Sequence, residues 1–386
     1  MKLLRFFAIA GLSSFLTPGY GQQEVPFSDK RWVVQAQGSM QEAYQGKNSL
    51  YLQNGMAYLK DANFLDGIIE FDIYLSYQVS FSGMVFRLTD PGNYEELYLR
   101  AQQSGYPDAY QYTPVFNGDP AWQLYHDQAD GVNDGFISWK PRGKGMGYNS
   151  VLSFPFDRWL HVKLLVKGKA AELYIDNKPE PVAFMRELLI EPRAGGLGVK
   201  SGVGAAHFAN FTYTATGNVE LRTKDDGYKI ITPAGTIPSW QVSEPFKEDK
   251  LKAMDQLDSK WTASLKWKAL KTEVTGLANL SRLSAVTDSN TVLATFTVLS
   301  EKEQLKRLDI GYSDRVKLYC NGSAVYAGNT SFRTRDFRYL GTIGYFDAVY
   351  LPLKKGENTI TLAVSETFGG WGVMAKWETT EFIKFP

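Results

Sequence analysis

The sequence predicts an all-β protein made of two antiparallel β-sandwich (jelly-roll) domains, and three observations support this fold class. Runs that alternate apolar and polar residues recur along the 386-residue chain, as in 159–166 and 291–299, and a period of two is typical of half-buried strands. Turn sequences such as Asp90-Pro91-Gly92-Asn93 separate these runs, and no long amphipathic helix interrupts them. The chain holds 22 Tyr, 23 Phe and 9 Trp, which are residues that favour sheets.

Each predicted strand follows from such an alternating run between turn residues. In the first domain the runs cover 68–75, 82–88, 94–100, 159–166, 171–175, 196–199 and 207–213. In the second domain they cover 291–299, 315–320, 324–327, 348–353 and 358–364. One helical stretch is expected at 247–257, because Pro245 suits the start of a helix.

The domain boundaries follow from a change in character along the chain. Residues 217–240 are crowded with Gly, Pro and Asp, including Pro233 and Pro238, and predict a linker with a short strand at 228–231. The two sandwiches are therefore expected at 22–216 and 241–386.

Residues 1–21 have the features of a secretory signal peptide. Lys2 and Arg5 precede an apolar core that begins at Phe6, and small residues follow up to Gly21. This core is too short to span about 30 Å of hydrocarbon. We expect an exported chain, secreted or periplasmic, without stable membrane insertion.

The composition excludes several classes of protein. A hydrophobic content of 44% with a formal net charge of +1 suits neither a disordered chain nor a strongly basic nucleic-acid-binding protein. The single cysteine, Cys320, excludes an internal disulfide framework and a Cys-rich zinc module, and its alternating surroundings predict a buried, inert thiol. With only three histidines, any chemistry is expected to depend on carboxylates.

Five strand-and-turn segments of the first domain carry a family resemblance. They are Gly67-Ile-Ile-Glu-Phe-Asp-Ile-Tyr74, Gly83-Met-Val-Phe-Arg87, Asn93-Tyr-Glu-Glu-Leu-Tyr-Leu-Arg100, Trp159-Leu-His-Val-Lys163 and Ala171-Glu-Leu-Tyr-Ile-Asp-Asn177. In these segments the domain resembles the concanavalin A-like lectin/glucanase fold, including its laminin-G-like relatives, over roughly residues 30–215. The resemblance implies an antiparallel sandwich of a kind used to bind or process sugars.

Two segments of the second domain carry another resemblance. They are Val316-Lys-Leu-Tyr-Cys-Asn-Gly322, which ends in a tight hairpin turn, and Val349-Tyr-Leu-Pro-Leu-Lys-Lys-Gly-Glu-Asn-Thr-Ile360. In these segments the domain resembles the galactose-binding-like jelly roll that is attached to glycosidases. The resemblance implies a sandwich, with carbohydrate binding or a structural role.

Glucanases of the lectin-like fold carry a Glu-x-Asp-x-x-Glu motif on one strand, where its acids face the cleft. Glu70 and Asp72 match the first two acids, but Leu75 stands in place of the last. The departure puts hydrolysis by that family's mechanism in doubt, and a solvated acidic face is the alternative.

The stretch from 100 to 139 is long, polar and rich in aromatic residues, and such loops on β-scaffolds usually carry function. Aromatic rings stack on sugars, while amide and carboxylate groups bind hydroxyls. The candidate ligand-binding residues are Arg100, Tyr106, Gln111, Tyr112, Asn117, Trp122, Tyr125, His126 and Trp139. The alternative is that half of these rings pack beneath the loop.

No cofactor is required by the sequence, and a structural calcium ion is the one metal considered. Asp127, Asp130 and Asp134 lie in an acidic loop that contains Gly, and calcium favours such oxygen-rich loops. The loop does not fit the EF-hand pattern, so an ordinary polar loop is the alternative.

The second domain offers a further set of candidates. Arg333, Arg335 and Asp336 lie among aromatic residues, where they are expected either to bind an anionic sugar or to pair with Asp314 or Asp347 and fix the loop. Trp371 follows two glycines and forms either an interdomain contact or a ligand platform.

Together these observations predict an exported protein that binds carbohydrate or glycoconjugate without catalysis. A divergent glycoside hydrolase or polysaccharide lyase is the first alternative. The second is an extracellular structural or adhesion module with a protein partner.

Overall fold

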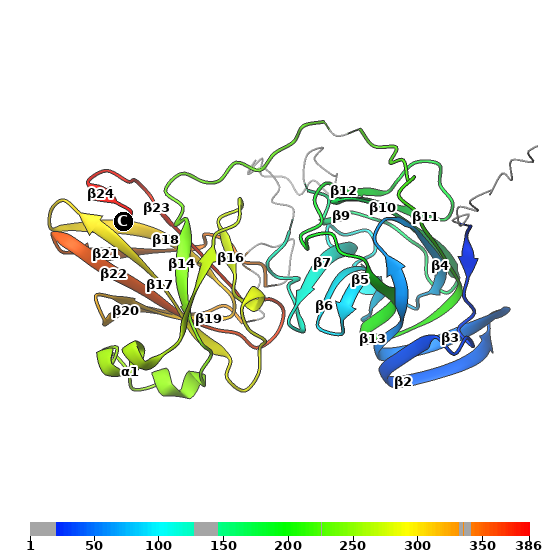
Figure 1. Ribbon diagram of the computed structural model, residues 1–386, viewed down its shortest axis with the longest axis horizontal. Coiled ribbons are helices and arrows are strands. Elements are labelled where there is room, and N and C mark those ends of the chain that lie inside the picture. The colour runs from blue at the N-terminus through cyan, green and yellow to red at the C-terminus, as the bar shows by residue number, and fades with distance from the viewer. Residues whose placement is uncertain (1–20, 127–145, 225, 332–334, 336–340) are drawn as a thin grey trace, which may run out of the picture.

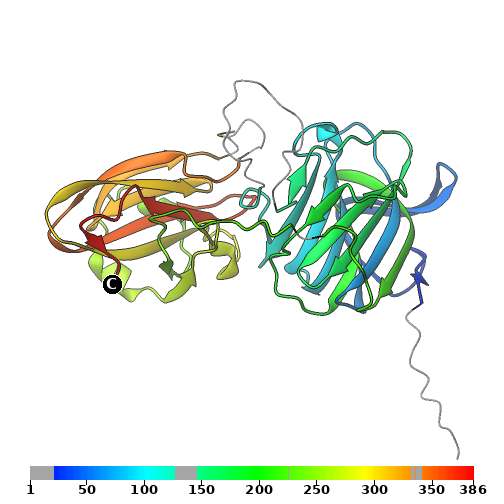
Figure 2. The same cartoon turned by 90° about the horizontal axis from the view of Figure 1, so that it is seen from above.

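The computed structural model describes residues 21–126, 146–224, 226–331, 335 and 341–386. Its 24 strands pair antiparallel throughout these ranges, and the α-helix α1 (Ser259–Ser264) is short, which confirms the all-β class. Figures 1 and 2 show two β-rich units side by side along the long axis. None of the helices within these ranges is long and apolar enough to cross a membrane. The expected signal peptide lies almost wholly outside them.

The first unit is one hydrogen-bonded sheet of 13 strands that folds over a single core. Its main path runs β12-β11-β10-β4-β13-β5-β6-β7-β8, with β1 and β3 on β13, β2 on β3, and β9 on β7. The bounds are β1 Gln23–Glu24, β2 Trp32–Tyr44, β3 Lys47–Phe64, β4 Gly67–Tyr74, β5 Phe81–Asp90, β6 Asn93–Arg100, β7 Tyr110–Phe116, β8 Asp119–Pro120, β9 Asn149–Ser150, β10 Trp159–Lys167, β11 Ala170–Ile175, β12 Ala183–Met185 and β13 Gly195–Ala215. The 3-10 turn η1 (Ala101–Gln103) follows β6.

Strand β13 joins the two layers of this folded sheet. Its first half pairs with β5 and its second half with β4, and the register with β3 shifts between Ser201 and Ala205. Gly204 lies at this shift with φ +98°, and a Cβ there would stand 2.3 Å from the Val79 carbonyl oxygen. The sequence predicted two separate strands here, because it does not reveal that the chain bends between layers without leaving the sheet.

The second unit is a sandwich of two sheets. One sheet runs β15-β14-β17-β22-β19-β20 with β24 on β17, and the other runs β16-β23-β18-β21. The bounds are β14 Ser239–Ser243, η2 Glu248–Leu251, β15 Trp267–Lys271, β16 Leu277–Asn279, η3 Leu280–Arg282, β17 Thr291–Ser300, β18 Gln304–Tyr312, β19 Arg315–Cys320, β20 Ser323–Asn329, β21 Asp347–Leu353, β22 Gly356–Ser365, β23 Gly372–Trp377 and β24 Ile383–Lys384. Trp240, Trp371 and Trp377 are fully buried in its core.

Two local predictions were wrong. The stretch 247–257 holds only the 3-10 turn η2, and helix α1 begins later because the Asp258 carboxylate accepts the amides of Lys260 and Trp261 and so caps it. No strand forms at 228–231, where Tyr228 and Ile230 instead pack against the first core.

An apolar contact joins the two units. Leu124 and Ala121, which follow β8, belong to one buried cluster with Leu277, Ile343 and Met374 of the second unit. This cluster is the core of the first unit, so that core continues across the interface. We define the interface segment as residues 119–125.

Polar contacts surround this apolar contact. The Gln123 amide donates to the Gly369 carbonyl at 2.8 Å, and its own carbonyl accepts from the Ile343 amide at 3.0 Å. The Gln123 side chain accepts the Ser313 hydroxyl at 3.0 Å. Gly369 has φ +121°, and a Cβ there would stand 2.8 Å from both the Trp122 and Gln123 side chains, so the close approach needs glycine.

Replacing Leu124 with alanine tests whether the interface contributes to stability. Truncation of a buried leucine typically costs about 2–5 kcal/mol, so we expect a clearly lower urea midpoint for Leu124→Ala. Leu305→Ala is the matched control, because Leu305 is 71% exposed. Equal midpoints for the two variants would contradict a stabilising interface.

Candidate functional site

Strand alternation builds a polar and aromatic face on the outside of the first unit. In β4 and β10 the side chains of Phe71 and Leu160 point into the core, whereas their neighbours point outward. The register places Tyr74 opposite Trp159 and Asp72 opposite His161. We call this region the Asp72 face; its members are Tyr44, Lys47, Asp72, Tyr74, Trp159, His161, His207 and Asn210.

The β2–β3 hairpin completes this face from one side. Gln45 and Gly46 have positive φ angles of 45° and 80° and form a two-residue turn between the paired Tyr44 and Lys47. The Trp159 indole N–H donates to the Gln45 carbonyl at 3.0 Å and anchors the hairpin tip. Lys47 and Tyr44 are therefore held over the sheet.

Asp72 is the centre of the polar contacts. Its carboxylate accepts from Lys47 Nζ at 2.5 Å and from Asn210 Nδ2 at 2.6 Å, and lies 2.9 Å from His161 Nδ1. Burial alone raises the pKa of Asp72, but hydrogen bonds from His161, Lys47 and Asn210 outweigh it, so the pKa is lowered. Asn210 reaches Asp72 from an irregularity in β13, where its φ is +51°.

The geometry fixes the imidazole of His161. An ionised carboxylate can only accept, so Nδ1 carries a proton toward Asp72 and Nε2 faces away from the carboxylate. The His161 side chain is 27% exposed, and the hydrogen bonds of the described residues leave Nε2 without a partner. Such an Asp–His pair is able to orient a base for proton transfer.

Aromatic rings surround this pair. The Tyr44 ring stacks on His207 with centroids 3.7 Å apart, and the Tyr74 ring meets Tyr44 edge-on at 5.0 Å and Trp159 at 5.6 Å. Tyr77, three residues after Tyr74 in the chain, is 72% exposed and meets Phe156 edge-on at 5.1 Å. The arrangement offers apolar ring surface next to hydrogen-bonding groups of both kinds, which suits a ligand with alternating apolar and hydroxyl faces.

The structure also shows what the acidic motif does. Glu70 and Asp72 share a face, but Glu70 pairs with Lys163 at 3.0 Å as Asp72 pairs with Lys47. Leu75 is buried. Each acid is thus neutralised by its own lysine, and no third acid follows on the strand.

Most of the predicted ligand-binding residues in 100–125 are buried. Arg100 pairs with Asp108, and Tyr112 donates to the fully buried Glu95, whose pKa burial raises to about 7 despite that hydrogen bond. The Gln111 amide donates to the Trp122 carbonyl at 2.7 Å. These side chains are enclosed by their neighbours, and their ligand-binding role stays a prediction.

The remaining candidates of this stretch contact the second unit or solvent. Asn117 donates to the Ser281 carbonyl at 2.7 Å, and the Tyr125 hydroxyl donates to Glu273 at 2.9 Å. His126 Nδ1 lies 3.0 Å from the Thr342 hydroxyl. Tyr106 is 51% exposed. The polar groups that were expected to bind hydroxyls therefore join the units.

The second-domain candidates that the structure describes have structural contacts. Arg335 forms an ion pair with Asp347 at 3.1 Å, which matches the structural alternative. The Trp371 ring is buried and donates to the Val364 carbonyl, while its amide donates to Asp119 of the first unit. The following candidates lie outside the described residues: Asp127, Asp130, Asp134, Trp139, Arg333 and Asp336. Within the described ranges, no three His, Cys, Asp or Glu side chains are arranged to hold a metal.

One pocket of the second unit has a volume of about 440 Å³. It is lined by Glu303, Gln304, Leu305, Cys320, Asn321, Ser323, Val325, Pro352, Leu353 and Lys354. Because no aromatic ring lines it, it lacks a stacking surface for a sugar. Cys320 is buried as predicted, and burial raises the pKa of its thiol.

Sequence reasoning missed most of the Asp72 face. A usable signal was present, because Trp159 and His161 occupy alternate, outward positions of a strand whose other positions are apolar. The contribution of Tyr44 and Lys47 was not visible, since it depends on where the hairpin folds.

Neither the comparison with protein-family models nor the search of curated proteins finds a match. Among solved structures, the chain is similar to a carbohydrate-binding module (CBM66) from Bacillus subtilis, with 15% identity and a TM-score of 0.34 over 48% of this chain and 95% of that chain. It is also similar to a Bacillus licheniformis beta-glucanase, with 10% identity and a TM-score of 0.35 over 51% and 98% of the two chains. A family 35 carbohydrate-binding module from an environmental isolate matches with 17% identity and a TM-score of 0.20 over 25% and 72%.

The substitution Asp72→Asn tests the charge network. Hydrogen bonds to charged groups contribute about 1.5–3 kcal/mol, so we expect a lower Tm for the variant at pH 7. Because the folded pKa of Asp72 is lowered, its contribution is present above the unfolded value of about 3.9 and is lost as pH falls through the folded pKa. The difference in Tm should narrow in acid. Asp61→Asn, at an exposed position of β3, should match the wild type at both pH values.

Proposed function

We propose that this chain is an exported protein that binds carbohydrate or glycoconjugate through the Asp72 face. The observation that carries the proposal is the half-buried Trp159 ring, which meets Tyr74 edge-on beside a hydrogen-bonded cluster of opposite charges. Rings provide stacking surface, and side chains held by their neighbours can meet hydroxyls with little loss of side-chain freedom. Export follows from the predicted signal peptide.

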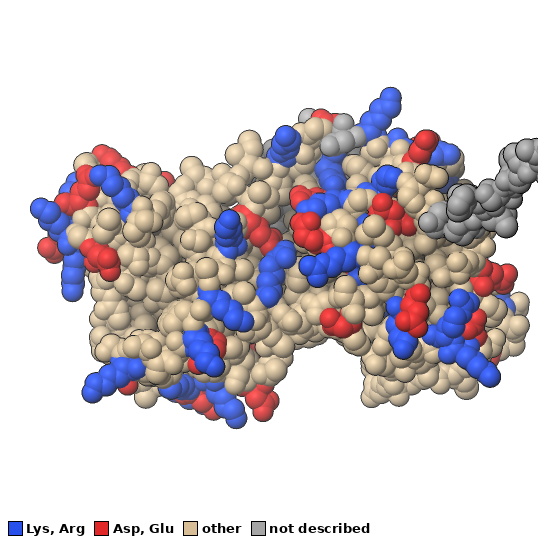
Figure 3. Space-filling view, viewed as in Figure 1, with Lys and Arg blue, Asp and Glu red and all other residues tan. Residues whose placement is uncertain are grey.

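The charge distribution agrees with an uncharged or weakly charged ligand. Lys47 pairs with Asp72 within the face, and outside it Lys163 pairs with Glu70 and Arg158 with Asp176. On the side of the molecule shown in Figure 3, basic and acidic side chains are intermixed. A polyanion such as nucleic acid would favour a one-signed surface.

The test is a glycan array of plant, algal and animal glycans, followed by calorimetry with the best ligand. Large aromatic residues at the centre of a binding surface often carry 1.4 kcal/mol or more, about a tenfold change in Kd. We therefore expect Trp159→Ala to weaken binding by about tenfold.

Tyr350→Ala is the matched control, because Tyr350 is 63% exposed on β21 of the second unit. Its Kd should stay within about twofold of the wild type. Absence of any bound glycan, or an unchanged Kd for Trp159→Ala, would contradict the proposal.

A second candidate function is catalysis on a bound sugar, in a divergent glycoside hydrolase or polysaccharide lyase. The specific observation in its favour is the Asp72–His161 pair, whose 2.9 Å contact directs Nε2 away from the carboxylate. A base held in this way typically contributes about 10²–10⁴-fold to a rate.

Assays for new reducing ends and for unsaturated sugar ends distinguish this candidate from simple binding. If it is correct, His161→Ala should lower turnover by about 100-fold or more while Kd changes little. Binding without either product in the wild type would leave the non-catalytic function.

A further inference from the structure

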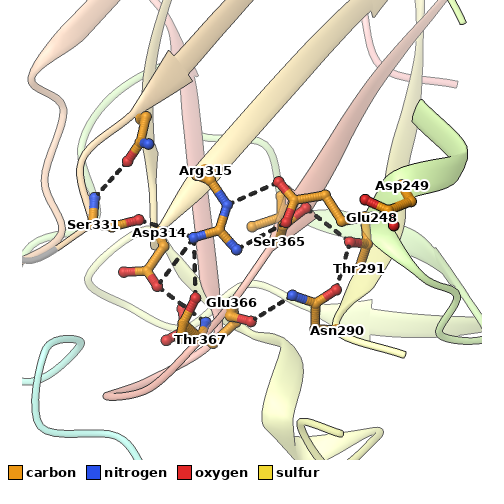
Figure 4. A network of polar contacts seen from close by, with 12 residues as sticks. Glu248, Asp249, Asn290, Thr291, Asp314, Arg315, Ser331, Ser365, Glu366 and Thr367 are labelled. Carbon is orange, nitrogen blue, oxygen red and sulfur yellow. Dashed lines mark hydrogen bonds and ion pairs between the residues drawn. The ribbon is translucent and has the colours of Figure 1, made fainter. Parts of the chain in front are cut away.

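A carboxyl group without a partner is buried where the two units meet. Glu366 directly follows β22, and its side chain has no exposed surface. Neither carboxyl oxygen has a well-formed hydrogen bond, and the nearby Ser313 hydroxyl and Phe368 amide only partly offset its burial. Its backbone is fixed, because its amide donates to the Asn290 carbonyl and its carbonyl accepts the Asn290 side chain at 3.0 Å (Figure 4).

Two further carboxyl groups lie close to Glu366. Asp314, between β18 and β19, is buried and accepts the Thr367 amide at 3.0 Å. Asp119 of the first unit is buried on the other side of the interface and accepts the Trp371 amide at 3.1 Å. Each acid has an electrostatic interaction with Glu366 that disfavours a second negative charge.

Arg315, the basic residue of this network, pairs mainly with an acid other than these three. Arg315 forms a two-pronged ion pair with Glu248 at 2.8 and 2.9 Å, whereas its contact with Asp314 is 3.7 Å (Figure 4). The Ser313 hydroxyl lies near Glu366 but donates to Gln123. Among the residues that the structure describes, the charged groups that face the three acids are Arg315 and Glu248, which largely neutralise each other.

Three ionised carboxylates in such a place would repel one another at low dielectric. Burial raises the pKa of Glu366 well above its usual range, and Asp314 and Asp119 add to this by their charge. Burial also raises the pKa values of Asp314 and Asp119. The docked molecule therefore favours the protonated form of at least one of the three carboxyl groups.

We propose that the two units are held together by a proton-dependent latch, in which Glu366 must be protonated for the interface segment to stay docked. Asp119 belongs to the first unit and Glu366 to the second, so ionisation of Glu366 sets two negative charges against each other across the interface. The same segment carries Gln123 and Leu124, whose contacts would be lost together when it undocks. The latch is independent of what the Asp72 face binds.

The direction of the pH effect follows from linkage. Glu366 has a higher pKa in the docked state than in the unfolded chain, so docking favours the protonated form. Its stabilising effect is fully present below the unfolded value of about 4.3 and is lost as pH rises through the docked pKa. The interface should therefore open toward neutral and alkaline pH.

Hydrogen exchange of the full chain tests the latch. Peptides that cover 121–124 report on the Gln123 amide, which is bonded across the interface. After correction for intrinsic exchange, we expect their protection to fall by about tenfold or more between pH 5 and pH 8, because docking favours the protonated form of Glu366. In Glu366→Gln, which copies the protonated acid, the fall should be below about twofold.

Asp249→Asn is the matched control, because Asp249 is an exposed acid that pairs with Lys252 on the same side of the network (Figure 4). It should retain the pH dependence of the wild type. Asp314→Asn should weaken that dependence, since it removes one of the repelling charges. A pH-independent wild type, or an equal fall in wild type and Glu366→Gln, would overturn the proposal.

Discussion

The insertion of residues 119–125 between the two units is the contact on which the rest of the architecture depends. This short segment continues the first core into the second unit through Leu124, and it satisfies backbone groups of both units through Gln123. Its close fit requires glycine at 369. The contact also buries Asp119 near another acid, Asp314. The residues that stabilise the contact between the two units therefore also make this contact sensitive to protons. The reason is that burial disfavours the ionised form of acids such as Asp119.

The Asp72 face follows a different rule. Its acid is buried but accepts hydrogen bonds from Lys47, His161 and Asn210, which favour its ionised form. At the interface, burial dominates and favours the protonated form of the carboxyl groups. Two sets of acids in one protein thus have opposite protonation preferences, and the difference lies in how many donors the surrounding strands bring to each carboxylate.

The fold class and about half of the strands could be predicted because alternation is a local property. Residues 291–299 and 315–320 lie in strands almost as expected. Strands β2 and β3 were missed, since their residues line both a core and an exposed surface with mixed polarity.

The candidate site was predicted less well. The aromatic residues in 100–125 have the composition of a sugar-binding loop, but the same composition suits a polar domain interface, and only the position of the second unit distinguishes them.

The Asp72 face is assembled from widely separated parts of the chain. Asp72 is 25 residues from Lys47, 89 from His161 and 138 from Asn210. During synthesis its carboxylate can meet the lysine first, whereas the histidine and the asparagine emerge from the ribosome much later. Contacts of such long range slow folding, because loops must close before they form. A fragment that ends before β13 would therefore contain Asp72 and Lys47 but lack Asn210. The Asp72 face is thus completed late in the maturation of the protein.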